Sequence, residues 1–244
     1  MIPDLLKIAD GQMEAFKAIQ EQQSLTGEVD VAPQRYVAAY DLAAHANDLA
    51  IDAIDLTKRK RFASATPLTR LIFECAMHCQ WLVMNPTAHS SLLTDNELHR
   101  ERLTKTLRVS QSFKHLLEAE HIDVTEYEKV APKNIRDVCE AVNDGDSSLY
   151  IIYRSLSSGS HSGIPLIERW IAEVLDPPGL AFRVEPSTDP TQFNQLAGTI
   201  AISLLWTNSA FNCMTRAQPM QQLIDENSRE LETKPLLGVG KLVL

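Results

Sequence analysis

The stretch Leu68-Thr-Arg-Leu-Ile-Phe-Glu-Cys-Ala-Met-His-Cys-Gln-Trp-Leu-Val-Met84 decides the fold. Its apolar residues fall on nearly every side of a helix, a pattern typical of a helix at the centre of a bundle. Thr66 followed by Pro67 predicts that this helix begins there, with Thr66 as the N-cap. The dipeptide Asn85-Pro86 predicts its end.

Other segments share the helical spacing of apolar residues. Residues 191–217 form a second strongly apolar segment, and long extended runs of β-branched residues are nearly absent. Further helices are predicted at 4–23, 33–61, 94–120, 132–143, 164–174 and 219–232, with a capping box at Thr94 to Glu97 and a short extended piece at 180–184. The sequence therefore predicts an all-α, single-domain helical bundle of about seven to nine helices.

The chain divides into three parts by its pattern. Residues 1–32 read as an N-terminal helix and linker, residues 33–217 as the bundle core, and residues 218–244 as a C-terminal helix and apolar tail. An apolar tail either docks on its own bundle or contacts another subunit.

Composition excludes several classes of protein. The 244 residues carry a net charge of −9, which argues against non-specific DNA binding but leaves room for a small basic pocket acting on RNA. No apolar run approaches the roughly 20 residues that a membrane span needs. The N-terminus lacks the pattern of a secretory signal, and four scattered cysteines do not suggest a disulfide framework, so we expect a cytoplasmic protein.

The segment Tyr150-Ile-Ile-Tyr-Arg-Ser-Leu-Ser-Ser-Gly-Ser-His161 concentrates polar groups beside apolar ones. Arg154 and His161 are seven residues apart, so both would project from one face if the helix continued. Gly159 could instead end the helix and let His161 turn back. We expect chemistry here before anywhere else in the chain.

Three other groups of residues have a functional and a structural interpretation. Cys75, His78 and Cys79 share one helix face and suit zinc, but no second cluster completes the ligand set, and buried cysteine is a common core residue. The carboxylates of Asp48, Asp52 and Asp55 could hold a divalent cation, although a solvated helix face is the simpler explanation. The cations of residues 58–61 could contact phosphate, or simply end a helix favourably. Since the structural interpretation is the simpler one for each group, we expect no bound metal or cofactor. The usual nucleotide-binding motifs are missing from the sequence.

Two motifs carry a resemblance to known proteins. Arg70-Leu-Ile-Phe-Glu74 lies on the central apolar helix, and Tyr153-Arg-Ser-Leu-Ser-Ser-Gly-Ser-His161 follows about 80 residues later. Over roughly residues 35–215 the chain resembles a widespread, mostly uncharacterised family of bacterial all-α proteins. It is also similar to the HEPN superfamily, whose ribonuclease members carry an Arg and a His separated by a short spacer. This chain has Ser155 directly after the Arg, where active members commonly carry Asn, Asp or His.

The resemblance implies a metal-independent endoribonuclease of a toxin or phage-defence type. Arg154 and His161 would be the catalytic residues, with Arg70, Glu74, Tyr153 and Ser157 binding or supporting. The ribonucleases it resembles place two Arg–His pairs together at a dimer interface, so the resemblance also implies a homodimer. RNA or a small ligand is the expected partner, without DNA or membrane.

The same residues also fit a second class of function. In this alternative the chain is a non-catalytic binding or scaffold protein, and Arg70, Glu74, Arg154 and His161 form a buried polar network that fixes helix register. A ligand pocket would then be lined by Trp81, Tyr153, Arg154 and His161. Catalysis requires Arg154 to be reachable from solvent, whereas the network requires Arg154 to be buried and paired with Glu74.

Overall fold

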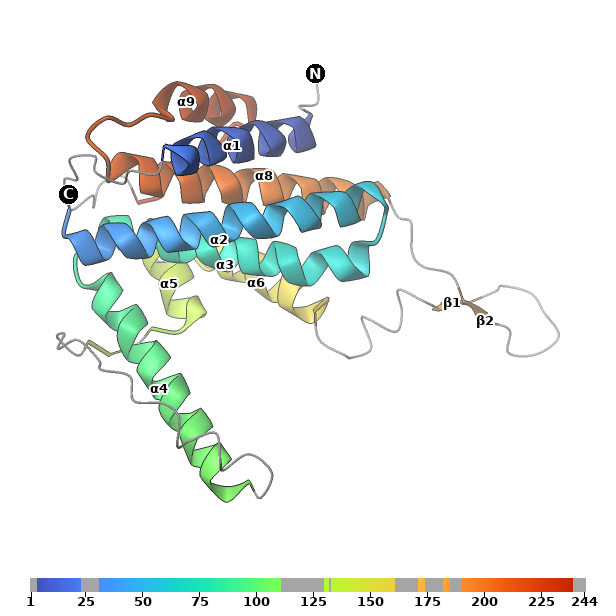
Figure 1. Ribbon diagram of the computed structural model, residues 1–244. Helices are drawn as coiled ribbons and strands as arrows, with labels where there is room; N and C mark the ends of the chain where they lie inside the picture. Colours follow the sequence, from blue (N-terminus) through green and yellow to red (C-terminus); the bar gives the residue numbers. More distant parts are fainter. Residues whose placement is uncertain are drawn as a thin grey trace.

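The computed structural model describes residues 4–22, 31–110, 130, 131, 133–160, 171–173, 182–184 and 190–238. These residues form an all-α helical bundle, as predicted (Figure 1). In chain order the elements are α1 (Leu5–Glu21), α2 (Pro33–Lys58), α3 (Phe62–Met84), α4 (Ala88–Val109), α5 (Ile135–Val142), α6 (Ser148–Ser158), β1 (Ile171–Glu173), β2 (Phe182–Val184), α8 (Pro190–Cys213) and α9 (Gln221–Glu230).

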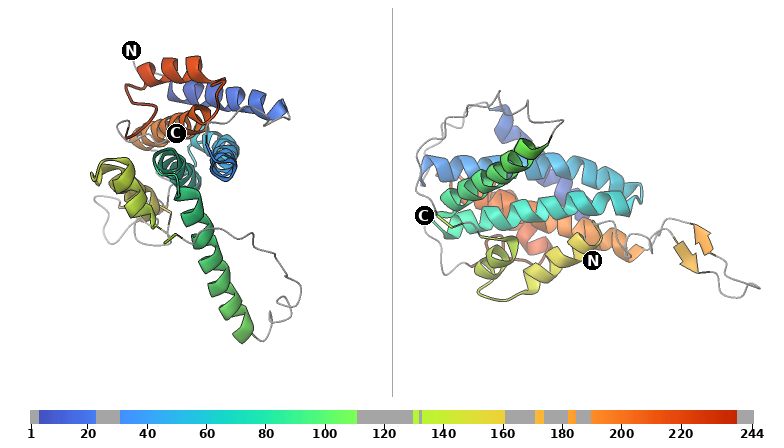
Figure 2. Two further views of the ribbon diagram at one scale, coloured as in Figure 1. Left: turned by 90° about the vertical axis from the view of Figure 1, so that its left-hand side faces the viewer. Right: turned by 90° about the horizontal axis from the view of Figure 1, so that it is seen from below.

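Three long helices make the centre of the bundle. Helices α2, α3 and α8 pack against one another, and α1 lies on α8 (Figure 1). Helix α3 lies between α2 on one side and the short helices α5 and α6 on the other (Figure 2). The most apolar segment of the sequence is therefore the central helix, as its pattern predicts.

The core combines small side chains on one helix with large side chains on its neighbours. One side of α2 places five alanines of 0% exposure against its neighbours, which lets the helix axes approach closely. Large side chains from α1, α3 and α8 fill the remaining space around them. The largest fully buried apolar side chains are Phe16, Ile72, Phe73, Met77, Leu82, Ile200, Leu204, Leu205, Phe211 and Met214. Because Phe16 belongs to this core, α1 is part of the same packed bundle.

Helix α3 begins earlier than the Thr-Pro signal predicts. It starts at Phe62, so Thr66 is not its N-cap, and Pro67 lies inside the helix. The Thr66 hydroxyl instead donates to the Phe62 carbonyl at 2.8 Å. Burial of Phe62 and Ala65 in the core explains the extra turn, because tertiary packing outweighs the local preference of Thr-Pro for a helix start.

Helix α4 also begins before its predicted capping box. It starts at Ala88, and Thr94 lies within it, donating its hydroxyl to the Ser90 carbonyl at 2.9 Å. Only the first turns bury residues against the bundle, and the rest of α4 projects away from it (Figures 1 and 2). The predicted polar outer helix is thus confirmed as far as Val109, while residues 111–120 lie outside the described part of the chain.

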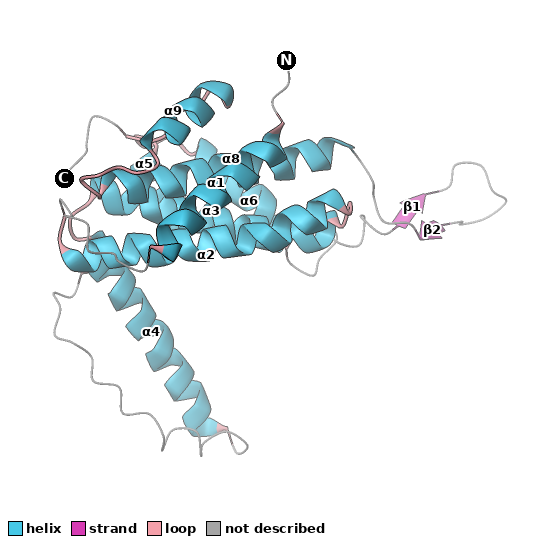
Figure 3. Ribbon diagram, turned by 45° about the horizontal axis from the view of Figure 1, so that its top comes forward, coloured by secondary structure: helices cyan, strands magenta, loops and turns pink. Residues whose placement is uncertain are grey.

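The described strands are β1 and β2, which pair antiparallel with Ala172 opposite Arg183 (Figure 3). The extended piece predicted at 180–184 is confirmed for Phe182–Val184. The helix predicted at 164–174 is wrong at its end, because Ile171–Glu173 is a strand. Both pieces are only three residues long, so pairing rather than sequence preference selects the extended form.

The start of the C-terminal tail docks on its own bundle. The buried Gln80 amide donates to the carbonyls of Trp206 and Pro235, at 2.7 and 3.1 Å, and accepts the Leu237 N–H at 2.7 Å. The Trp206 indole donates to the Lys234 carbonyl at 2.9 Å. This settles the open question about the tail for residues 234–237, while residues 239–244 lie outside the described chain.

Candidate functional site

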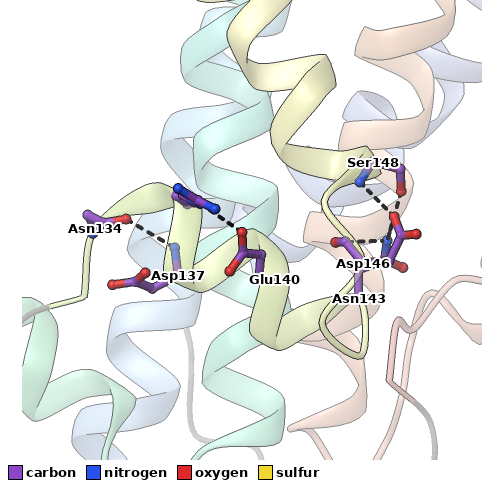
Figure 4. A network of polar contacts seen from close by, with 7 residues as sticks. Asn134, Asp137, Glu140, Asn143, Asp146 and Ser148 are labelled. Carbon is purple, nitrogen blue, oxygen red and sulfur yellow. Dashed lines mark hydrogen bonds and ion pairs between the residues drawn. The ribbon is translucent and has the colours of Figure 1, made fainter.

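A tight loop sets the start of α6. The Asp146 carboxylate accepts from the Ser148 N–H at 2.6 Å and from the Asn143 amide at 3.1 Å (Figure 4). Gly145 has a φ of +87°, which a residue with a side chain rarely adopts. Hydrogen bonds from Ser148 lower the pKa of Asp146, so the carboxylate stays charged at the N-terminus of α6, where negative charge is favourable.

Helix α5 supports the same end of α6. Asn134 caps α5 by accepting the Asp137 N–H at 3.0 Å, and Arg136 pairs with Glu140 at 2.8 Å (Figure 4). The Arg136 guanidinium also lies over the Tyr150 ring, 5.7 Å from its centroid. Tyr150 in turn stacks on Tyr153 with ring centroids 5.9 Å apart. The aromatic residues of α6 are thereby held from the α5 side.

The two motifs of the sequence meet across the α3–α6 interface. On α3, Arg70 Nε lies 3.5 Å from Glu74 Oε1, and both side chains are about one quarter exposed, at 23% and 26%. On α6, the Tyr153 side chain is hydrogen-bonded both to Glu74 and to Ser157. Four predicted residues, Arg70, Glu74, Tyr153 and Ser157, therefore form one polar cluster that joins α6 to the central helix.

Partial burial changes the acidity of this cluster. Desolvation raises the pKa of Glu74, and the opposing effects of the Arg70 charge and the Tyr153 hydrogen bond do not cancel it. Desolvation likewise raises the pKa of Tyr153, with a further contribution from the Glu74 charge. The tyrosine therefore stays neutral and can donate to the carboxylate.

Arg154 stands apart from this cluster. It is exposed on α6, so it is not the buried partner of Glu74 that the alternative of a structural network requires. Helical geometry explains why: Tyr153 and Ser157, four residues apart, share the face towards α3, and Arg154 is turned by about 100° from Tyr153. Helix α6 ends at Ser158 with Gly159 as its C-cap, which confirms that the helix does not continue to His161. His161 lies outside the described residues.

A groove lies between α6 and the first turns of α8. Its volume is about 290 Å³. Ile151, Ile152, Ser155 and Leu156 of α6 form one wall, and the others come from α3 and α8: Thr66, Gln192, Gln195, Leu196 and Thr199. Sequence reasoning missed this site, because its walls come from segments that are far apart in the chain and carry no motif.

Within the residues that the structure describes, Trp81 does not line the expected ligand pocket. Trp81 is only 3% exposed and packs in the main core, so it cannot line a ligand site together with Tyr153. Its large ring contributes instead to the packing of α3. Among the described residues, the groove between α6 and α8 offers a ligand site on this face.

The cysteine and histidine cluster on α3 belongs to the core. Burial raises the pKa of Cys75 to about 12 and raises that of Cys79 as well, so both thiols stay protonated. Burial lowers the pKa of His78 to about 4. Across the described part of the chain, no group of three or more His, Cys, Asp or Glu side chains is arranged to hold a metal ion.

The three aspartates that recur along the second half of α2, and the lysine at its end, are solvated. Asp48, Asp52 and Asp55 are exposed, and Asp55 pairs with Arg59 at 2.9 Å. Lys58 reaches Asp10 of α1 at 3.4 Å. These surface pairs fit the simpler interpretation of both the acidic face and the basic helix end.

A helix that spans a membrane must be both long and strongly apolar. None of the described helices is both long and apolar enough to cross a bilayer.

Comparison with known proteins places the chain in a family. Residues 36–174, more than half of the chain, match a family described as a family of unknown function (DUF5677), and the chain belongs to it. No curated protein and no solved structure matches the chain. The matched region contains both motifs, including Arg70, Glu74, Tyr153 and Arg154.

Proposed function

We propose that this chain is a HEPN-like, metal-independent endoribonuclease of a toxin or phage-defence type, with Arg154 and His161 as its catalytic residues. One observation carries the proposal: Arg154 is exposed on a helix whose opposite side is anchored to the core. Catalysis requires an arginine that substrate can reach, and a structural network requires a buried one. The exposed position of Arg154 therefore favours a catalytic role over a role in a structural network.

Contacts with α3 and α5 hold α6, the helix that carries Arg154, in a fixed position. Glu74 holds Tyr153 from α3, and Arg136 covers the Tyr150 ring from α5. A guanidinium on a well-held helix loses less freedom when it binds an anion than one on a mobile segment does. The cluster of Arg70, Glu74, Tyr153 and Ser157 thus has a positioning role in the proposal.

The proposed reaction uses the 2′-hydroxyl of RNA as the nucleophile. The 2′-oxygen attacks phosphorus as a base removes its proton, and the bond from phosphorus to the 5′-oxygen breaks as that oxygen gains a proton. His161 suits either proton transfer near neutral pH. Arg154 stabilises the negative charge that grows on the phosphate oxygens. The products carry a 2′,3′-cyclic phosphate and a free 5′-hydroxyl.

A homodimer would supply both proton transfers. One Arg–His pair offers a single histidine, whereas two pairs brought together offer a base and an acid at once. The HEPN resemblance supports this arrangement, and it would bring two copies of α6 close to each other.

The test is RNA cleavage in the presence of EDTA with end-group analysis of the products. Wild type should cut and leave 2′,3′-cyclic phosphate ends, while folded Arg154→Ala and His161→Ala chains should not cut. Arg102→Ala, an exposed arginine on the projecting helix α4, is the matched control and should cut at the wild-type rate. Cleavage that needs added metal, or that survives in both variants, would overturn the proposal.

A second candidate is a non-catalytic binding protein. The groove between α6 and α8 favours it, because hydroxyl and amide groups meet apolar surface there as they do in ligand sites. Ligand binding by wild type and by the His161→Ala chain, with no cleavage of any RNA by either, would support this candidate.

A further inference from the structure

The groove between α6 and α8 joins two kinds of surface. Its apolar part comes from Ile151, Ile152, Leu156 and Leu196, and Ile151 and Ile152 are 64% and 38% exposed. Its polar part comes from the amides and hydroxyls of Ser155, Gln192, Gln195, Thr66 and Thr199. Exposed isoleucines beside a concave surface leave apolar area that a ligand can cover.

The lining residues are all neutral. A phosphate or another strongly charged group would need a cationic partner within the groove, and the lining offers none. A flat heterocycle with apolar faces and a polar edge fits both parts of the surface. The isoleucine side chains can cover its faces, while a glutamine amide offers one donor and one acceptor group to its edge.

The hydroxyls add acceptors to the lining. Thr199 donates its hydroxyl hydrogen to the Gln195 carbonyl, and Thr66 donates to the Phe62 carbonyl, each at 2.8 Å. A lone pair of the Thr199 hydroxyl oxygen can still accept a hydrogen bond, and the exposed Gln195 side chain can donate one. This pattern of donors and acceptors can distinguish one base edge from another.

The groove lies next to the proposed catalytic arginine. Ile151 and Ser155 line the groove, and Arg154 follows Ile151 by three residues on the same exposed face of α6. A phosphate held at Arg154 would therefore leave an adjoining base within reach of the groove. A volume of about 290 Å³ is at the small end of ligand pockets, which suits one base rather than several.

We infer that this groove holds a single nucleobase of the RNA strand whose backbone meets Arg154, and that Gln195 reads the edge of that base. The inference rests on the proposed function for its substrate class. The groove chemistry alone would equally accept the base of a free nucleotide, and the experiment separates these two sources.

The experiment measures binding of the four nucleoside 3′-monophosphates to the full-length chain by calorimetry, together with the base found at RNA cut sites. Wild type should bind one nucleotide at least about tenfold more tightly than the weakest, because a good edge contact discriminates by about 1–3 kcal/mol. Gln195→Leu should reduce this ratio at least fivefold and broaden the bases at cut sites. Asn194→Leu, at an exposed neighbouring position outside the groove, should change neither quantity.

The binding and cleavage results together separate the base site from the ribonuclease activity. Equal binding of all four nucleotides by wild type, or an unchanged ratio in a folded Gln195→Leu chain, overturns the base site. Selective binding that Gln195→Leu weakens, without RNA cleavage, keeps the base site, assigns it to a free nucleotide and rejects the ribonuclease. Cleavage with no base preference rejects the base site and keeps the ribonuclease.

Discussion

The Tyr153 side chain of α6 is hydrogen-bonded to the Glu74 carboxylate of α3. The two residues are separated by 78 others in the chain, and their contact joins the helix that carries Arg154 to the centre of the bundle. Ser157 holds the tyrosine from its own helix, and Arg70 lies beside the carboxylate. Removing any one of these groups should therefore weaken the attachment of α6 to the bundle.

Replacing Tyr153 by Phe removes the hydroxyl and keeps the ring that stacks on Tyr150. We expect the free energy of unfolding to fall by about 1 kcal/mol, since one hydrogen bond to a partly buried carboxylate is lost. Denaturant unfolding at neutral pH measures this change. Tyr150→Phe is the matched control and should leave stability nearly unchanged. An unaltered midpoint for Tyr153→Phe would mean that the hydrogen bond does not hold α6.

The raised pKa of Glu74 gives a stability effect that depends on pH. The folded chain holds the proton more tightly than the unfolded chain, so this contribution is complete below the ordinary pKa of 4.5 and is lost as pH rises through the folded pKa. The stability of wild type relative to Glu74→Gln should therefore be greater at pH 4 than at pH 7. Other titrating groups occur in both chains and cancel in the comparison. A relative stability that rises from pH 4 to pH 7 would contradict the raised pKa.

His78, one turn after Glu74 on α3, should respond to pH in the opposite direction. Its folded pKa of about 4 lies below the ordinary value of 6.5, so its contribution is complete above pH 6.5 and is lost as pH falls towards 4. Relative to His78→Gln, wild type should lose up to about 2 kcal/mol of stability between pH 7.5 and pH 5. Chemical denaturation of both chains at the two pH values tests this. Parallel pH profiles would show that His78 is as accessible to protons in the folded chain as in the unfolded one.

Replacing Gln80 by Leu should release the tail. The substitution leaves the Leu237 N–H and the Pro235 carbonyl without their partner, at a cost of about 2 kcal/mol. Hydrogen exchange of the Leu237 amide should become faster, while the helix amides of α2 stay protected. Gln34→Leu, at an exposed position of α2, should change neither property. Slow exchange at Leu237 in the Gln80→Leu chain would show that other contacts hold the tail.

The periodicity of apolar residues was sufficient to predict the helices that pack in the core. The apolar segments predicted at 68–84 and 191–217 correspond to α3 and α8, although α8 ends at Cys213, because most residues in the middle of these helices are buried. Helix starts were less predictable. The Thr66-Pro67 and Thr94-Asp95-Asn96-Glu97 signals are local, and core contacts of Phe62 and Ala88 extend the helices past them.

The candidate site was predictable only in part. The resemblance brought Arg70, Glu74, Tyr153 and Ser157 together, and the structure places them in one cluster. It could not assign the partner of Glu74, because Tyr153 and Arg154 are neighbours and helix rotation alone decides which of them faces α3. Two other features were not predictable, since each depends on contacts between distant segments: the pairing of Gln80 with residues 235 and 237, and the groove between α6 and α8.

The most direct test of the central claim compares stability and activity in one variant, Arg154→Ala. Because Arg154 is exposed, the free energy of unfolding should stay within about 0.5 kcal/mol of wild type. RNA cleavage in EDTA should fall at least about 100-fold, since the charge that stabilises the transition state is lost. A large loss of stability, or cleavage at the wild-type rate by the folded variant, would contradict a catalytic role for Arg154.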